Sequence, residues 1–213
     1  TNGASADNVY WHVTGATTIG AGAVFAGTAL TKGAITVGAG SKVRGRLLTI
    51  DGAVTLDSSE IYSYDAPVLT LSTATIDLAK ADSFAILAAG AISNVGETNV
   101  VGDIGANPSN VFTGQESLTQ DGELHLADTA AIQAKADLQS AYDTASSAFI
   151  PATPISGDLI GLTLTAGAYR SLGALSLTGN LIFDAKGDPD AVFLIQSGGA
   201  VNVAAGATMA VIN

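Results

Sequence analysis

The side chains that most often carry catalysis or bind metals are few and scattered in this sequence. There is no cysteine, which excludes disulfides, thiolate nucleophiles and cysteine-bound metals. The two histidines, His12 and His125, share no motif, and we expect structural roles for both. Asp188 and Asp190 flank Pro189, but the spacing of a calcium-binding EF-hand loop is missing and Asp-Pro favours a turn. We therefore predict no enzyme activity, no cofactor and no metal.

Short polar side chains form a second group of interest, because they alternate with apolar residues in short segments. Thr36 lies between Ile35 and Val37, for example, and Asn202 lies between two valines. Successive side chains of a β-strand point to opposite faces, so we expect the apolar residues inside and the short polar residues outside. Stacked strands of this kind would present a flat ladder of hydroxyl, amide and carboxylate groups with almost no charge.

The elements that must position these residues repeat along the first part of the chain. Residues 18–31 align with residues 36–49 at an offset of 18 residues, and a third copy begins one residue late at Val54. Glycines coincide in the first two copies, and the aligned apolar pairs are Ile19 with Val37, Phe25 with Val43 and Leu30 with Leu48. A period of this length with glycines at fixed corners indicates one β-helix coil per repeat.

The rest of the chain contains one clear helix between further β segments. Residues 127–148 are rich in alanine and lack proline and glycine, whereas Pro151 and Pro154 end the pattern. At about 1.5 Å per residue this helix would be roughly 30 Å long, which corresponds to about six strands stacked about 4.8 Å apart. Residues 63–126 are less regular, and residues 155–213 return to the β pattern. We predict a mainly β fold, a parallel β-helix of about six coils with a long α-helix packed alongside.

Composition narrows the classes of function. The 213 residues hold 8 Lys and Arg against 19 Asp and Glu, and this net charge of −11 argues against nucleic-acid partners and anionic membrane surfaces. Hydrophobic residues make up 47%, which excludes a disordered chain, and we expect residues 1–213 to form one domain. No apolar stretch reaches the roughly 18 residues of a membrane span. We predict a monomer with no nucleic-acid or membrane partner.

Nine segments together resemble a known family. The sequence is similar to the microbial ice-binding (antifreeze) proteins, which have a discontinuous right-handed β-helix and one long flanking helix. The resemblance covers nearly the whole chain. The segments that carry it are Gly3–Trp11, Gly45–Leu48, Gly52–Leu56, Phe84–Ala88, Val101–Gly105 with Pro108, the alanine-rich helix after His125–Asp128, Gly161–Tyr169, Leu177–Leu181 and Gly187–Phe193.

The order of these segments departs from the family. In the family, a segment like the one that ends this chain at Asn213 leads directly into a segment like the one that begins it at Thr1. The family's N-terminal segment, like residues 76–88 here, follows its C-terminal segment, like residues 53–62. This order resembles a circular permutation, and we predict that residues 63–72 join the former ends. Permutation succeeds when native termini lie close together and the new ends fall in an exposed turn.

The resemblance implies a protein, secreted by a microbe of a cold habitat, that adsorbs to ice crystal planes. It would thereby produce thermal hysteresis and inhibit ice recrystallisation, with ice as its partner. A flat, regular face suits this role, because an ice lattice has no side chains to enter a pocket. Threonine loses little entropy on ordering, because its χ1 angle is stiff. The alternative is a β-helical cell-surface adhesin or carbohydrate-binding module, which an exposed Tyr and Trp cluster would favour.

We predict that the ice-binding face is the one built by the short strands and the small turns that follow them. The other exposed face is a poorer candidate, because Arg44 and Arg46 would place long mobile charges on it. Residues 14–17 also match a Thr-Gly/Ala-x-Thr/Asn motif that the family places in ice-facing turns. The predicted ice-binding residues are Thr14, Thr17, Thr18, Thr36, Ala39, Ser41, Thr55, Asp57, Thr163, Thr165, Ser176, Thr178, Asn202 and Ala205.

Overall fold

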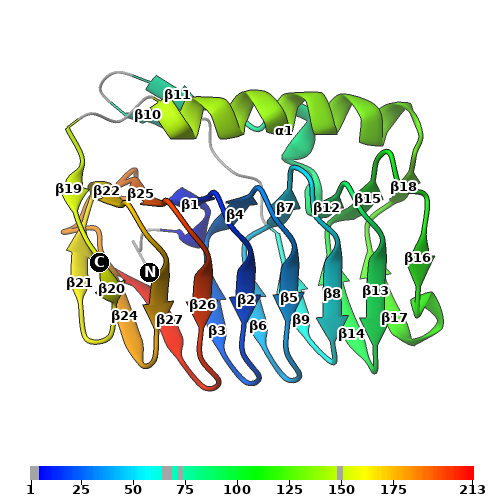
Figure 1. Ribbon diagram of the computed structural model, residues 1–213, viewed down its shortest axis with the longest axis horizontal. Helices are drawn as coiled ribbons and strands as arrows, with labels where there is room; N and C mark the ends of the chain where they lie inside the picture. The colour runs from blue at the N-terminus through cyan, green and yellow to red at the C-terminus, as the bar shows by residue number, and fades with distance from the viewer. Residues whose placement is uncertain (1–4, 64–68, 72–73, 148–150) are drawn as a thin grey trace.

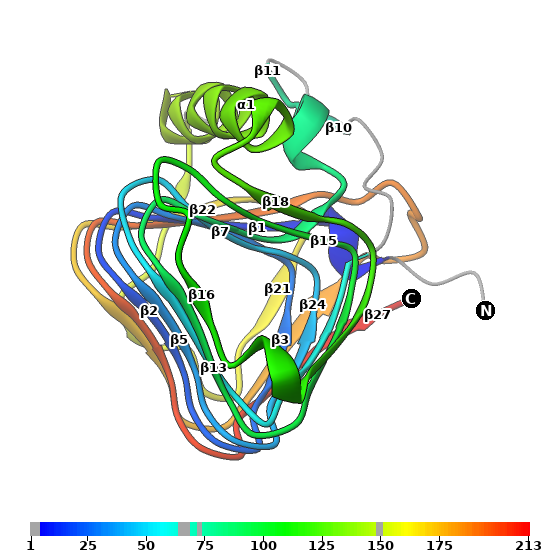
Figure 2. The same cartoon turned by 90° about the vertical axis from the view of Figure 1, so that its right-hand side faces the viewer.

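The computed structural model shows a solenoid of triangular cross-section with one long helix along its side (Figures 1 and 2). The structure describes residues 5–63, 69–71, 74–147 and 151–213. Each coil contributes one short strand to each of three parallel sheets, which we name A, B and C. Viewed along the solenoid, the sheets form the three sides of the triangle, and helix α1 (Thr129–Ser147) lies outside sheet A (Figure 2).

The order of the strands in space differs from their order in the sequence. Sheet A holds, in spatial order, β18 (Leu124–Leu126), β15 (Asp103–Ala106), β12 (Phe84–Ala88), β7 (Leu47–Thr49), β4 (Thr28–Thr31), β1 (Val9–Val13), β25 (Phe193–Ser197), β22 (Gly167–Ser171) and β19 (Thr153–Pro154). Sheet B holds β16 (Phe112–Thr113), β13 (Ile92–Val95), β8 (Val54–Asp57), β5 (Ile35–Val37), β2 (Thr17–Ile19), β26 (Val201–Val203), β23 (Leu175–Leu177) and β20 (Gly157–Asp158).

Sheet C holds β17 (Leu118–Asp121), β14 (Thr98–Val101), β9 (Glu60–Tyr62), β6 (Lys42–Arg44), β3 (Val24–Ala26), β27 (Thr208–Ile212), β24 (Asn180–Asp184) and β21 (Thr163–Thr165). The described residues also form an antiparallel pair, β10 (Leu69–Leu71) with β11 (Ala74–Ile76), and the short 3-10 helices η1 (Ala6–Asn8), η2 (Ala79–Ala81) and η3 (Gln115–Ser117).

The strand registers confirm the repeat that the sequence predicts. Ile19 lies beside Val37, and the other two predicted apolar pairs are also neighbours on adjacent strands. The third copy enters with the predicted shift of one residue, because Thr36 pairs with Thr55. In the three-residue strands β2, β5 and β26 the first and third residues are buried and the second is exposed, as the alternation requires. The inward residues of all three sheets form one apolar core that fills the triangle.

Helix α1 is confirmed, with its start two residues later than predicted. Asp128 precedes the helix, and its carboxylate accepts a hydrogen bond from the backbone N–H of Ala131 at 2.9 Å, which caps the first turn. Leu138 and Tyr142 are buried against sheet A, within a second apolar cluster. In the described part of the chain, no helix is both long and apolar enough to cross a membrane.

The β-helix architecture is confirmed, but the predicted number of coils is wrong. Sheets B and C each have eight strands, which makes eight complete coils rather than about six. The 19 residues of α1 span about 28 Å, whereas eight strands stacked about 4.8 Å apart span about 34 Å. The prediction failed because it equated the length of the helix with that of the solenoid, whereas the solenoid is longer than the helix.

The first and the last coil of the described chain are neighbours in the middle of the solenoid, not at its two ends. Strand β1 pairs with β25 over five residues, and β2 pairs with β26 over three, so the first coil stacks directly on the last one. This stacking is what the predicted permutation requires, and the permutation stays a prediction. Of the predicted joining segment 63–72, residues 64–68 and 72 lie outside the described residues, and 69–71 form β10.

Candidate functional site: the outer face of sheet B

The outer side of sheet B carries one continuous row of short polar side chains. One outward residue from each strand lies beside its counterpart on the next strand, as Thr36 does between Thr18 and Thr55. The row therefore repeats at the spacing of parallel strands, about 4.8 Å. In spatial order it consists of Thr113, Ser93, Thr55, Thr36, Thr18, Asn202, Ser176 and Asp158, all exposed or half-buried. We call these eight residues the polar row.

A second row of small residues runs beside the polar row. The residue two positions before each member also points outward, and backbone bonds hold these residues in register. The N–H of Thr17 donates to the carbonyl of Ala34, and the N–H of Ile35 donates to the carbonyl of Ala53, both at 3.0 Å. This alanine row consists of Val111, Ala91, Ala53, Ala34, Ala16, Ala200, Ala174 and Ser156, and all eight are exposed or half-buried. Two parallel rows of short side chains make a shallow, regular surface.

This surface is nearly free of charge. Asp158, on the edge strand β20, is the one charged member of the two rows. The Thr178 hydroxyl donates a hydrogen bond to the carboxylate of Asp158 and thereby lowers its pKa. Beyond the strands the surface continues into turns whose exposed residues are also small, including Ala39 and Ala205.

The other two sheets present different outer sides. Sheet A is covered by α1, and its outward residues Leu30 and Leu48 are fully buried. On sheet C the outward residues Lys42 and Arg44 of β6 are exposed. Sheet B is therefore the side of the triangle that is both open to solvent and nearly uncharged.

Most of the predicted site residues lie on or beside this face. Five are members of the polar row, namely Thr18, Thr36, Thr55, Ser176 and Asn202. Five lie at its margins: Thr14, Ala39 and Ala205 are exposed in turns, Thr178 is exposed after β23, and Asp57 is half-buried at the end of β8.

The structure contradicts the prediction for Thr17 and Ser41, because both side chains are buried. The Thr17 hydroxyl is hydrogen-bonded to the Thr31 hydroxyl at 2.8 Å inside the solenoid. The Ser41 hydroxyl lies inside its turn and is within hydrogen-bonding distance of the carbonyls of Gly38 and Gly20, at 2.6 and 2.9 Å. A hydroxyl that closes a turn from the inside has no access to an external surface.

The prediction that Thr163 and Thr165 belong to the ice-binding face of the short strands is wrong. They are exposed, but their strand β21 pairs with β24 in sheet C. The sheet B strand of that coil is β20, which has only two residues, Gly157 and Asp158, and so lacks the apolar alternation that marks the other strands.

The prediction that Arg46 lies with Arg44 on an exposed face is also wrong. Gly45 adopts a φ of +139° at the corner between sheets C and A, where a Cβ would lie 2.1 Å from the carbonyl oxygen of Gly27. Arg44, before this corner, is exposed on sheet C, whereas Arg46, after it, lies at sheet A on the same outer side as Leu48 and is fully buried. Its guanidinium forms ion pairs with Asp82 at 2.7 Å and with Asp7 at 3.8 Å.

Sequence reasoning missed Ser93, Thr113 and Asp158 of the polar row, together with the whole alanine row. A signal was present, because the tripeptide Ala-x-Thr, Ala-x-Ser or Ala-x-Asn recurs in six coils. It begins at Ala16, Ala34, Ala53, Ala91, Ala174 and Ala200. The first residue of each tripeptide belongs to the alanine row and the third to the polar row. The remaining two coils have Val-Phe-Thr and Ser-Gly-Asp in its place.

The aspartates and histidines that the sequence offers as candidates for catalysis or metal binding make structural contacts instead. The N–H of Asp190 donates to the Asp188 carboxylate at 3.0 Å, which confirms the turn. His12 is buried beneath α1 and stacks on Tyr142, with 4.2 Å between ring centroids. His125 lies 2.7 Å from the Asp128 carboxylate just before the helix. Among the residues that the structure describes, no three His, Asp or Glu side chains gather as a metal site would require.

Comparison with known proteins agrees with this geometry. The family model described as Ice-binding-like matches residues 1–62 and 86–213. An ice-binding protein of Nostoc sp. (strain HG1) is 33% identical over 137 residues, which are 64% of this chain and 51% of that protein. The chain spans about half the length of the curated relatives it matches.

Two solved structures extend the comparison. An ice-binding protein from an Antarctic biological consortium is 37% identical, with a TM-score of 0.57 over 66% of this chain and 68% of that one. An ice-binding protein from an Antarctic bacterium of the Flavobacteriaceae is 30% identical, with a TM-score of 0.52 over 99% of this chain and 51% of that one. The β-helix with its packed helix, the family match and these relatives lead to one conclusion: the chain belongs to the ice-binding-like family.

Proposed function

We propose that this protein binds ice through the outer face of sheet B, by means of the polar row and the alanine row. The observation that carries the proposal is the continuity of the two rows across all eight coils, with a single charge at one edge. Ice presents the same pattern of oxygen atoms over its whole plane. A binding face therefore gains affinity by repeating one weak contact many times.

The spacing of the rows supports this proposal. Parallel strands hold the outward side chains about 4.8 Å apart, which is near one oxygen repeat of ice. The registers run from β16 to β20, so the spacing is kept across the chain ends, where Thr18 lies beside Asn202. A face assembled from separate loops would lack such a constant interval.

The chemistry of the rows also suits ordered water. A threonine on a strand holds its methyl and hydroxyl groups in a restricted χ1 rotamer, so little entropy is lost on binding. The alanine methyl groups beside it offer no hydrogen bonds and leave water to bond with itself. Hydroxyls that anchor water beside methyls that do not compete for it can hold a surface layer in an ice-like arrangement.

The rest of the proposal follows the family. The protein acts by adsorption, without catalysis or cofactor, as a secreted monomer whose partner is the ice surface. Adsorption holds back growth of the bound planes, which gives thermal hysteresis and slows recrystallisation. The alternative of a carbohydrate-binding face is less well supported on sheet B, because neither row contains an aromatic side chain that could stack on a sugar.

The test is to grow a single ice crystal in a nanolitre droplet of the protein. We expect faceted crystals and a gap between the melting and freezing temperatures that widens with protein concentration. Serum albumin at equal mass is the control. Round crystals that grow freely in the presence of folded protein would refute the proposal.

A further inference from the structure

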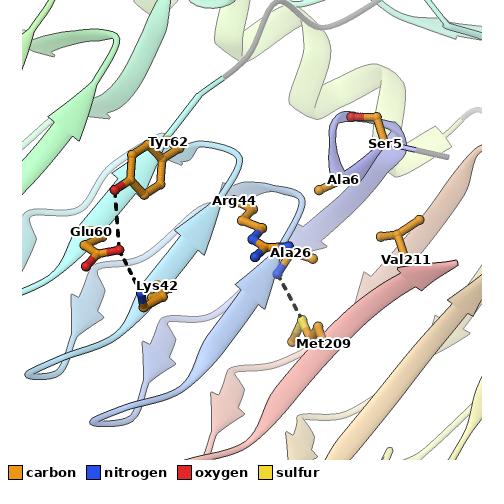
Figure 3. Close-up of a pocket in the computed structure, with 9 residues that line it drawn as sticks. All are labelled: Ser5, Ala6, Ala26, Lys42, Arg44, Glu60, Tyr62, Met209 and Val211. Atoms are coloured by element: carbon orange, nitrogen blue, oxygen red, sulfur yellow. Dashed lines mark hydrogen bonds and ion pairs between the residues drawn. The ribbon is translucent and has the colours of Figure 1, made fainter. Parts of the chain in front are cut away.

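A hollow opens in sheet C where strands β27 and β3 separate. Strand β27 pairs with β24 over five residues, but with β3 only through Thr208 and Val24. The N–H of Ala26 lies 3.4 Å from the sulfur of Met209 rather than bonding along a strand ladder. The hollow has a volume of about 350 Å³, and Figure 3 shows the side chains that surround it.

The charge of this hollow is opposite to that of the molecule. Lys42 and Arg44 point to the same side of β6, and the Lys42 ammonium lies 3.0 Å from the Glu60 carboxylate. Arg44 forms no ion pair with any residue that the structure describes, in a chain with 19 acidic and 8 basic residues. Two cations and one carboxylate leave one positive charge, so the hollow favours a ligand with a single negative charge.

The walls of the hollow are partly apolar. The neighbours of Arg44 on the adjacent strands are Ala26, which leaves room beside the guanidinium, and Tyr62, which presents a half-buried ring. Met209 and Val211 of β27 lie at the other end of the hollow from Tyr62, beyond Arg44 and Ala26 (Figure 3). The Tyr62 hydroxyl lies 3.4 Å from a Glu60 carboxylate oxygen. A charged group, hydrogen-bonding groups and an aromatic face thus converge on one space.

We propose that this hollow binds a uronate, a sugar ring that carries one carboxylate. The Arg44 guanidinium takes the carboxylate through paired hydrogen bonds, since its planar fork matches that group. The carboxylate of Glu60 accepts hydrogen bonds from ring hydroxyls, and the C–H side of the ring packs on Tyr62. A bare phosphate would use the cations but gain nothing from the apolar walls. A neutral sugar would leave Arg44 without its partner.

This site is separate from the proposed ice-binding face. It lies on sheet C, another side of the triangle (Figure 2), and none of its lining residues belongs to either row of sheet B. Uronate binding can therefore be tested independently of ice binding. It would allow the protein to be held on an acidic polysaccharide while sheet B stays open.

The experiment titrates the full chain with methyl glucuronide and, as the matched neutral probe, methyl glucoside, above the freezing point. Binding is measured by calorimetry, and NMR follows the Tyr62 ring and the Met209 methyl signals. We expect saturable shifts of both signals with the glucuronide, and affinity for the glucoside lower by about tenfold or more. Arg44→Gln should remove this preference, and Tyr62→Leu should weaken binding of both sugars.

The control variant is Lys32→Gln, which removes an exposed cation from another turn and should leave binding unchanged. Circular dichroism establishes that each variant is folded. Equal affinity for the two sugars, or no saturable shift at Tyr62 and Met209, would overturn the proposal. So would inorganic phosphate that binds as tightly as the glucuronide and displaces it, because the hollow would then recognise an anion and not a sugar.

Discussion

Sheets A and B are built from the same coils, yet their outer sides differ in what they present. On sheet A the outward residues of the central coils are large and apolar, such as Leu30 and Leu48, and α1 buries them completely. On sheet B the outward residues of the same coils are Thr18 and Thr36, and nothing described in the structure covers them. The backbone ladder is parallel in both cases.

The difference shows that the backbone provides the repeat and the outward side chains decide its use. A row of leucines stabilises the fold by taking a helix out of water. A row of threonines and alanines contributes little to that packing and leaves a regular surface free. The stability of the protein should therefore depend on sheet A, and its proposed function on sheet B.

The largest expected effect on stability comes from Leu48→Ala on sheet A. Removing a fully buried leucine leaves a cavity under the helix, and we expect the free energy of unfolding to fall by about 2–5 kcal/mol. Thr36→Ala in the polar row should change it by no more than about 0.5 kcal/mol. Denaturant unfolding followed by circular dichroism measures both. Equal losses in the two variants would remove the contrast between the sheets.

A smaller effect on stability should come from acid, through His12 beneath the helix. Burial lowers the pKa of His12 to about 4, so the folded protein keeps this side chain neutral. Between its ordinary pKa of about 6.5 and pH 4 the unfolded chain takes up a proton that the folded chain does not. Stability from this residue is complete above pH 6.5 and is lost as the pH falls to about 4, by up to about 3 kcal/mol.

The measurement compares thermal unfolding of the wild type and His12→Gln at pH 7 and pH 4.5. The variant should lose less stability between the two pH values, whatever its stability at pH 7. Thr36→Ala serves as the matched control on sheet B and should follow the wild type. An equally steep loss in His12→Gln would assign the acid sensitivity to other groups.

Local sequence patterns were sufficient for the repeat, the helix and the central polar row. Alternation of apolar and short polar residues depends only on strand geometry, and it placed Thr18, Thr36 and Thr55 correctly. The capping carboxylate of Asp128 set the start of the helix close to the predicted residue.

The errors arose where the geometry of a corner or a partner strand decides the outcome. At Gly45 the chain passes from sheet C to sheet A, so Arg46, two residues after an exposed arginine, is buried beside Asp82. Strand β20 is too short to carry an alternating pattern, whereas the next strand β21, with Thr163, has one although it belongs to sheet C. The hollow beside Arg44 depends on how β27 and β3 separate, which no local pattern records.

The most direct test of the central claim compares one bulky substitution on two faces. Thr36→Tyr places a large ring in the middle of the polar row, and Asn99→Tyr places the same ring at an exposed position of sheet C. Thermal hysteresis is measured at equal concentrations after both variants are shown to be folded. We expect Thr36→Tyr to lose most of the hysteresis and Asn99→Tyr to retain that of the wild type. Full hysteresis in Thr36→Tyr, with loss in Asn99→Tyr, would move the ice-binding face away from sheet B.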